Sequence, residues 1–157
     1  MDINLANCKT SAQAVTKICY NENTRNLNFR IKCGDLKDLK ECVQIIEGYN
    51  AFEWKKVNEA LDLCASLKRF YGKDNPNNGQ DFFEFEVARE GSPAIYIKYY
   101  AGSMDQLKFY SISGKTTKEF KPSTFKKLMD LFQEESLADE CNIYRKNIYE
   151  VCRLWWD

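Results

Sequence analysis

Histidine is absent from all 157 residues of this chain. Without imidazole, the sequence has no Ser-His-Asp or Cys-His catalytic arrangement, no histidine general base and no metal site that depends on a histidine ligand. The remaining reactive groups are carboxylates and thiols, which are scattered along the chain. The sequence therefore predicts a protein that binds rather than catalyses, with no catalytic residue, no metal and no cofactor.

Helix-breaking residues and long apolar runs are also scarce. The chain has three Pro and seven Gly, and no apolar run approaches the roughly 20 residues of a membrane span. The N-terminal sequence MDINLANCKTSAQ lacks the apolar segment of a signal peptide. With 44% hydrophobic and 29% charged residues, the composition is typical of a globular protein. We expect one α+β domain, residues 1–157, in the cytoplasm.

Neither sign of charge dominates, and the cysteines follow no recognisable motif. The 23 Lys and Arg residues balance 23 Asp and Glu residues, so no global field attracts nucleic acid or an anionic membrane. Seven cysteines at irregular spacing, without a CxxC pair, argue against a disulfide framework and against a cysteine zinc site. We interpret most of them as small buried hydrophobic residues in a reducing compartment, and whether one is reactive stays open.

The first half of the chain predicts a hairpin followed by two helices. Residues 15–20 (VTKICY) and 27–33 (LNFRIKC) flank a polar NENTR turn, and the second segment alternates apolar and polar residues. This pattern predicts an N-terminal β-hairpin. Apolar residues then recur at helical spacing over residues 35–48 and again over residues 50–71, which predicts two central helices.

The second half predicts an antiparallel meander. Strand-like segments cover residues 82–88, 94–100 and 106–112, separated by the turn sequences EGSP and AGSMD. They predict a sheet of three or four strands. A hairpin turn centred on Gly91 would place Glu84 opposite Lys98 and Glu86 opposite Tyr96.

Two helices are expected to complete the fold. Pro122 is suited to the first turn of a helix that carries four apolar residues on one side: Phe125, Leu128, Met129 and Phe132. Ser136, with Asp139 three residues later, resembles a capping box that would begin a final helix. Apolar residues then recur at gaps of four and three along one predicted stripe: Leu137, Cys141, Tyr144, Ile148, Val151 and Trp155.

Two local motifs resemble catalytic or nucleotide-binding elements. In SISGKTT, Gly114, Lys115 and Thr116 match the end of a phosphate-binding P-loop, but Phe109 stands where the first glycine is required. We interpret this segment as a basic turn. Glu84 and Glu86 would lie about 7 Å apart on one strand face, but we interpret them as ordinary cross-strand partners.

The outward face of the predicted meander offers a nucleic-acid hypothesis. The same register would put Tyr96 beside Tyr110 and Lys98 beside Lys108, so aromatic and basic groups would share one surface. Single-stranded nucleic acid binds to such surfaces through base stacking and phosphate contacts. Five further lysines follow: Lys115, Lys118, Lys121, Lys126 and Lys127. A solvated sheet face explains the same pattern, because Glu84 and Glu86 would repel phosphate.

In the last half of the chain, the predicted strands lead into the helical segment KEFKPSTFKKLMDLF. This order of elements resembles the sheet-then-helix units of Whirly and PUR-type single-stranded nucleic-acid-binding proteins. The resemblance implies binding of single-stranded DNA or RNA. The first half, with two successive helices after one hairpin, departs from their repeats, and we assign the chain to neither family.

The preferred hypothesis is a non-enzymatic protein that acts through protein–protein contacts. The aromatic content is 14%, and Trp and Tyr are favoured interface anchors, so the candidate partner-binding residues are Tyr149, Trp155 and Trp156. The apolar stripe of the final helix would pack on the sheet of the same chain, fill a groove of a partner or form a homodimer. An inhibitor, adaptor or accessory factor of a larger assembly fits these features, and small viral or mobile-element inhibitors share the profile.

Overall fold

The computed structural model describes residues 8–46, 52–66, 83–100, 122–147 and 149–157. In chain order, their elements are α1 (Ser11–Cys19), β1 (Phe29–Cys33), α2 (Leu36–Ile45), α3 (Trp54–Ser66), β2 (Phe83–Arg89), β3 (Pro93–Tyr100), α5 (Pro122–Ser136), β4 (Glu140–Lys146) and β5 (Tyr149–Trp155). The strands form one antiparallel sheet in the order β1-β2-β3-β5-β4. The predicted α+β class is therefore confirmed. No helix in the described segments is long and apolar enough to cross a membrane.

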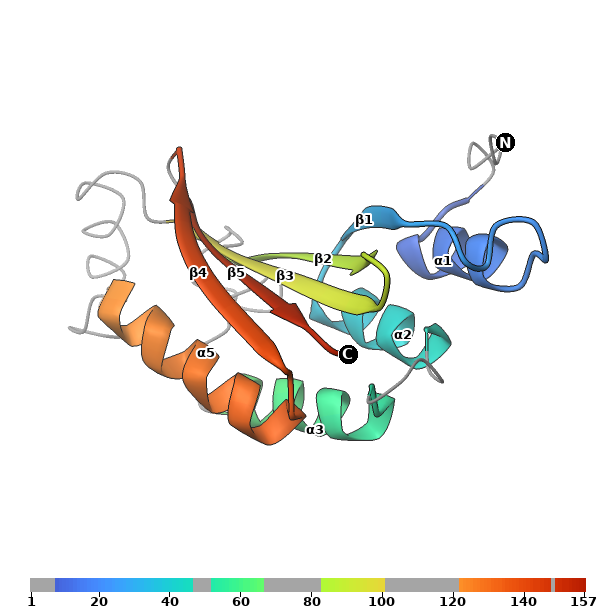
Figure 1. Ribbon diagram of the computed structural model, residues 1–157. Coiled ribbons are helices and arrows are strands. Elements are labelled where there is room, and N and C mark those ends of the chain that lie inside the picture. Colours follow the sequence, from blue (N-terminus) through green and yellow to red (C-terminus); the bar gives the residue numbers. More distant parts are fainter. Residues whose placement is uncertain (1–7, 47–51, 67–82, 101–121, 148) are drawn as a thin grey trace.

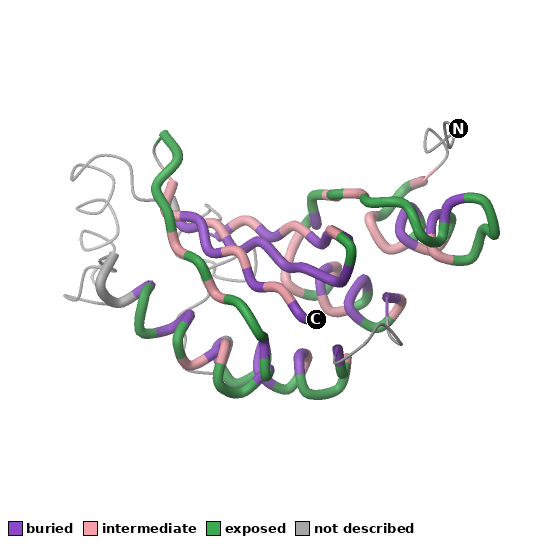
Figure 2. The backbone as a smooth tube through the Cα atoms, in the orientation of Figure 1, coloured by how far each residue is buried: buried purple, intermediate pink, exposed green. Residues whose placement is uncertain are grey.

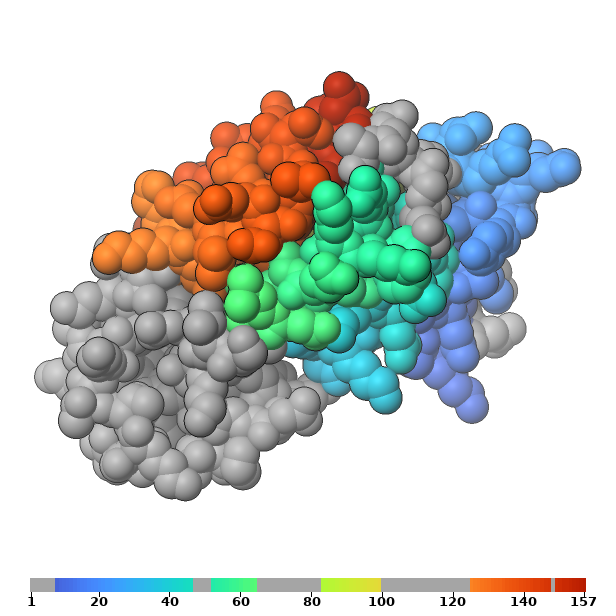
Figure 3. Space-filling model, turned by 90° about the horizontal axis from the view of Figure 1, so that it is seen from below, coloured from blue at the N-terminus to red at the C-terminus, as the bar shows by residue number. Residues whose placement is uncertain are grey.

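The described helices leave one face of the sheet uncovered. In Figure 1, α2, α3 and α5 lie below the sheet, and α1 packs beside α2 and β1. Figure 3, seen from below, shows α5 and α3 side by side, with α2 next to α3. No described helix lies on the opposite face. We call this surface the open face.

The core lies between the sheet and the helix layer. Along β2, Phe83, Phe85 and Val87 are buried toward the helices, whereas Glu84 and Glu86 are partly exposed on the open face. Strand alternation produces this division, because successive side chains point to opposite faces. Figure 2 shows the same contrast between buried central strands and the exposed strand β4. The helices contribute further core residues, which include Leu39, Val43, Val57, Leu61, Phe125, Met129 and Phe132.

Several sequence predictions are confirmed. The segment 27–33 contains β1, the two central helices are α2 and α3, and Pro122 begins α5 with all four predicted apolar residues buried. The β2–β3 register pairs Glu84 with Lys98 and Glu86 with Tyr96. Gly91 lies in the connecting turn at φ 76°, a left-handed conformation that glycine adopts without a steric penalty. The strand expected at 106–112 and the SISGKTT turn lie outside the described residues.

The predicted N-terminal hairpin is wrong. Residues 15–20 do not form a strand, because Ser11–Cys19 is the helix α1. The Thr10 side chain caps it by accepting a hydrogen bond from the Gln13 backbone N–H at 3.2 Å. β1 pairs instead with β2, with Phe29 opposite Arg89. The β-branched residues in VTKICY resemble a strand, but Ala14, Val15 and Ile18 form the buried side of a helix.

The predicted final helix is also wrong, since Glu140–Lys146 (β4) and Tyr149–Trp155 (β5) pair as an antiparallel hairpin. Ser136 ends α5 rather than beginning a helix. Leu137 follows in the left-handed region at φ 60°, and the Ala138 N–H donates to the Gln133 carbonyl at 3.3 Å. This is the Schellman arrangement of a helix C-terminus. The homodimer that we expected to form through a C-terminal helix is therefore wrong in that respect, because this segment consists of strands.

The final hairpin also changes the neighbours of β3. β5 pairs along β3 and places Arg153 opposite Tyr96 and Val151 opposite Lys98. Because β2 occupies the other edge of β3, the cross-strand neighbours of Tyr96 and Lys98 come from β2 and β5. Tyr110 and Lys108, which were expected beside them, lie outside the described residues. The sheet is thus not a simple meander of consecutive strands.

Candidate functional site

The open face collects charged and aromatic residues from all five strands. β1 and β2 contribute alternate polar residues, and β3, β5 and β4 contribute aromatic residues and arginine. The β2–β3 turn adds a glutamate. The residues that define this candidate site are Arg30, Glu86, Glu90, Tyr96, Lys98, Glu140, Tyr144, Tyr149, Arg153 and Trp155.

Tyr96 lies at the centre of the open face and is held on two sides. The Arg30 guanidinium carbon is 3.6 Å from the centroid of the Tyr96 ring, a close cation–π contact. The Tyr96 hydroxyl donates to the Glu90 carboxylate, with oxygen distances of 2.9 and 2.8 Å. Burial and the negative Glu90 acceptor together raise the pKa of Tyr96. The tyrosine stays neutral, and the residue is only 4% exposed.

Glu86 joins the cations of two neighbouring strands. Its Oε2 atom accepts hydrogen bonds from Arg30 Nε at 3.1 Å and Arg30 Nη2 at 2.7 Å, and it lies 3.2 Å from Lys98 Nζ. Burial opposes ionisation of Glu86, but the hydrogen bonds from Arg30 and Lys98 outweigh burial and lower its pKa. The carboxylate is therefore suited to binding cations and not to donating a proton near neutral pH.

Arg153 extends this network to the other side of the sheet. Its Nε atom donates to Glu90 Oε1 at 2.9 Å, and its Nη1 atom donates to Glu140 Oε2 at 3.1 Å. The Trp155 indole N–H donates to the Glu90 carbonyl at 3.0 Å. These bonds join the β2–β3 turn to β5 and β4. The polar part of the open face is therefore ordered before any partner arrives.

An apolar and aromatic area adjoins the network where β3, β5 and β4 meet. Ala88, Ala94, Tyr96 and Val151 form a small buried cluster, against which Tyr149 and Trp155 pack half-buried. Tyr144 lies opposite Val151 in the register and is 41% exposed. Aromatic side chains with one covered and one exposed surface are typical of interface anchors.

The three residues predicted to bind a partner are divided between the two faces. Tyr149 and Trp155 lie on the open face, where they pack against the cluster of Ala88, Ala94, Tyr96 and Val151. Trp156 lies on the opposite face and is 0% exposed, so its prediction as an exposed contact is wrong. It packs edge-on against Phe52 with ring centroids 5.0 Å apart, and its indole N–H donates to the Ser136 carbonyl at 2.9 Å.

The residues of the nucleic-acid hypothesis do not share one described surface. Tyr96 and Lys98 lie on the open face, but Tyr96 is covered by Arg30 and Lys98 pairs with Glu86. Lys126 and Lys127 are exposed on α5, which lies under the opposite face of the sheet (Figure 1). The remaining predicted residues lie outside the described segments: Lys108, Tyr110, Lys115, Lys118 and Lys121.

The seven cysteines are free thiols, and four of them are buried, in agreement with their interpretation as small core residues. Cys141 and Cys152 come closest, with sulfur atoms 3.5 Å apart on neighbouring strands. A hydrogen bond from Cys152 lowers the pKa of Cys141 and outweighs its burial. Burial raises the pKa of Cys64 to about 12, with help from Glu135. In the described part of the chain, no three Cys, Asp or Glu side chains are grouped in a way that could hold a metal ion.

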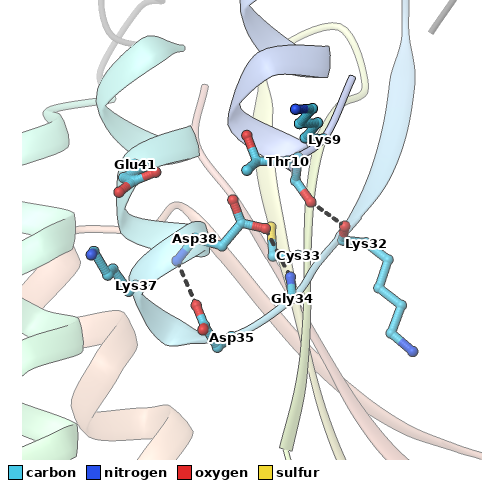
Figure 4. A pocket seen from close by; sticks show the side chains of 10 residues that line it. Lys9, Thr10, Lys32, Cys33, Gly34, Asp35, Lys37, Asp38 and Glu41 are labelled. Atoms are coloured by element: carbon cyan, nitrogen blue, oxygen red, sulfur yellow. Dashed lines mark hydrogen bonds between the residues drawn. The ribbon is translucent and has the colours of Figure 1, made fainter. Parts of the chain in front are cut away.

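A hollow of about 520 Å³ lies where α1, β1 and α2 meet (Figure 4). Asp38 lies between Gly34 and Asp35, and it accepts the Gly34 N–H at 2.8 Å while its own N–H donates to Asp35 at 2.8 Å. These carboxylates cap α2, and the Lys32 side chain points away from Asp38 in Figure 4. The hollow therefore combines helix-capping groups of mixed charge and is a weaker candidate than the open face.

No protein-family model, curated protein or solved structure matches the chain. Its function must therefore be argued from its own residues. Sequence analysis missed five members of the candidate site: Arg30, Glu90, Glu140, Tyr144 and Arg153. The alternation of β1 places Arg30 on the polar side and could have identified it, but no local pattern predicts the contacts of Glu90 with Arg153, which are 63 positions apart.

Proposed function

We propose that this protein is a non-enzymatic binding protein that uses the open face to contact a partner protein. The observation that supports this proposal best is the grouping of Tyr144, Tyr149 and Trp155 beside an ordered polar network on a face that no described helix covers. Tyr144 is exposed and Tyr149 and Trp155 are half-buried, so together they leave aromatic surface in water that a partner can cover. An inhibitor, an adaptor or an accessory factor of a larger assembly would use such a surface.

The charges on the open face favour a protein partner over a polyanion. Arg30 and Lys98 contact Glu86, and Arg153 contacts Glu90 and Glu140. Because each of these cations is paired with a carboxylate on the same face, the surface offers a phosphate backbone little net attraction. A protein surface with alternating donors, acceptors and apolar groups is the better complement.

Site-specific photo-cross-linking tests this proposal. A photoreactive phenylalanine at position 144 replaces an exposed tyrosine with a residue of similar shape, and the same residue at position 127 on α5 is the matched control. We expect a product of one defined mass from position 144 and none from position 127. A product that corresponds to a second copy of the chain is recognised by its mass and does not count.

A second variant makes the result specific to the open face. Replacing Trp155 by Ala removes an anchor of the open face and should weaken the affinity for the partner by about tenfold or more, and lower the yield of the cross-linked product with it, because truncation of a central aromatic anchor costs about 2 kcal/mol or more. Equal yields from positions 144 and 127, or a yield that Trp155→Ala leaves unchanged, would count against the proposal.

Single-stranded nucleic acid stays the alternative partner, and a binding measurement separates it from a protein. If the alternative holds, a labelled oligonucleotide is retained by the protein and its affinity falls as salt rises. Lys126→Glu with Lys127→Glu would weaken that binding without touching the ion pairs of the open face. Under the protein-partner proposal, no such retention is expected at physiological salt.

A further inference from the structure

Among the described strands, β4 lies at one edge of the sheet. It pairs with β5 on its inner side, and no described strand pairs with its outer side. Its exposed residues include Glu140, Asn142, Tyr144 and Lys146. Alternate backbone N–H and C=O groups of an edge strand point away from the sheet and can pair with another strand. Figure 2 shows most of β4 as exposed.

The charges along β4 are complementary to those of a second β4. Glu140 begins the strand and Lys146 ends it, and the register with β5 places both on the same face. In an antiparallel pair centred on Ile143, Glu140 lies opposite Lys146 of the second copy. Twofold symmetry produces this contact twice. Opposite charges directly across an antiparallel pair stabilise it, whereas like charges there destabilise it.

The same register suits the rest of the strand. Ile143 lies opposite Ile143 of the second copy on the helix side, and Tyr144 lies opposite Asn142 of the second copy on the open side. Because even-numbered residues face even-numbered residues, the twofold axis is perpendicular to the sheet. The helix layers of both copies then lie on one side. A register shifted by one residue would place one copy's helices on the other side.

We propose that the protein forms a symmetric homodimer by antiparallel pairing of β4 with β4 of a second copy, centred on Ile143. The two five-stranded sheets then become one continuous sheet, and the two open faces lie side by side. This goes beyond the proposed function, because a monomer still has its open face, whereas the dimer presents two partner-binding surfaces in a fixed relation. Such an arrangement favours a partner with repeated sites.

Charge reversal tests the register by sedimentation. The wild-type chain should show a concentration-dependent dimer. Lys146→Glu places like charges at both symmetry-related contacts and should weaken self-association roughly tenfold. Lys127→Glu makes the same charge change on the exposed side of α5 and should leave the dimer unchanged. Circular dichroism of each variant shows whether the fold is retained.

A mixing experiment provides the stricter test. Glu140→Lys should also weaken self-association, although it additionally removes the contact between Glu140 and Arg153 within one copy. When Lys146→Glu and Glu140→Lys chains are mixed, every contact between positions 140 and 146 joins one Lys to one Glu. The mixture should therefore form a heterodimer at least as tight as the wild-type dimer.

Three results would overturn the proposal. The first is a wild-type chain that stays monomeric at every concentration, and the second is a dimer that neither charge reversal weakens. The third is a mixture that associates no better than the separate variants. A dimer that Trp155→Ala weakens and Lys146→Glu does not would assign self-association to the open face instead of the β4 edge. Partner cross-linking from position 144 by a monomeric variant would still support the proposed function.

Discussion

The guanidinium of Arg30 stacks on the ring of Tyr96 while the same group donates two hydrogen bonds to Glu86. One side chain on β1 therefore fixes an aromatic ring on β3 and a carboxylate on β2. Arginine suits this position because its planar guanidinium group can stack on a ring with its face and, at the same time, donate hydrogen bonds in its own plane. The positions of these three side chains in the candidate site therefore depend on one another.

The lowered pKa of Glu86 predicts that its contribution to stability depends on pH. Because its pKa is lower in the folded protein than in the unfolded chain, its contribution is present above its ordinary value of 4.5 and is lost as the pH falls through the folded value. Glu86→Gln should lower the free energy of unfolding by about 1 kcal/mol at neutral pH, since Arg30 is partly exposed to water. The difference from wild type should shrink below pH 4.5. Urea unfolding at several pH values measures it, and a difference that grows in acid would contradict the assignment.

The burial of Trp156 predicts a large loss of stability on truncation. Its side chain is 0% exposed, packs against Phe52 and donates to the Ser136 carbonyl, so Trp156→Ala leaves a cavity and an unpaired carbonyl. The expected cost is about 3 to 5 kcal/mol in the free energy of unfolding. Trp155→Phe is the neighbouring control, because it retains a ring and loses only the hydrogen bond to Glu90, at about 1 kcal/mol. Equal stability losses for the two variants would mean that Trp156 is not a core residue.

The left-handed conformation of Leu137 predicts a stabilising substitution. A non-glycine residue at φ 60° is strained by about 1 to 2 kcal/mol, and Leu137 is 54% exposed, so little burial is lost on truncation. Leu137→Gly relieves the strain but raises the entropy of the unfolded chain, for a net gain of about 0.5 to 1 kcal/mol. Leu137→Ala keeps a Cβ atom and should give no gain. Thermal unfolding of both variants measures the difference, and a less stable glycine variant would contradict this account.

The β2–β3 hairpin was predictable because its determinants are local. The two strands alternate apolar and polar residues, and Gly91 can adopt the left-handed conformation that the turn requires. Together these features fix the register, in which Glu84 lies opposite Lys98. The helices α2 and α5 were predictable for the same reason, since each has an apolar side with the helical period.

The C-terminal hairpin was missed because its sequence satisfies two periods. Gaps of four and three residues suggested a helix, yet Cys152, Leu154 and Trp156 also alternate as in a strand and are buried on the helix side. Asn147, at φ 56° between the two strands, is the local turn signal. Whether this segment folds as a helix or as a strand depends on its pairing with the edge of β3, which β5 occupies. This pairing joins residues that are distant in sequence. The candidate site could not be derived for the same reason: Arg30 and Glu86 are 56 positions apart.

The thiol pair on β4 and β5 predicts selective cysteine chemistry. Cys141 is half-buried, and the hydrogen bond from Cys152 lowers its pKa, whereas burial raises the pKa of Cys64 to about 12. Because the thiolate is the nucleophile, iodoacetamide should modify Cys141 in the native protein well before Cys64. Mass spectrometry of peptides from timed reactions measures both rates.

Substitution of the hydrogen-bond donor tests the cause of this reactivity. Cys152→Ala removes the group that donates to Cys141, so the pKa of Cys141 should rise and its modification near neutral pH should slow several-fold. Cys152→Ser keeps a donor of similar size at the same place and should retain most of the rate. If alanine and serine at position 152 have the same effect, the hydrogen bond across the 3.5 Å between the two sulfur atoms does not control the reactivity of Cys141.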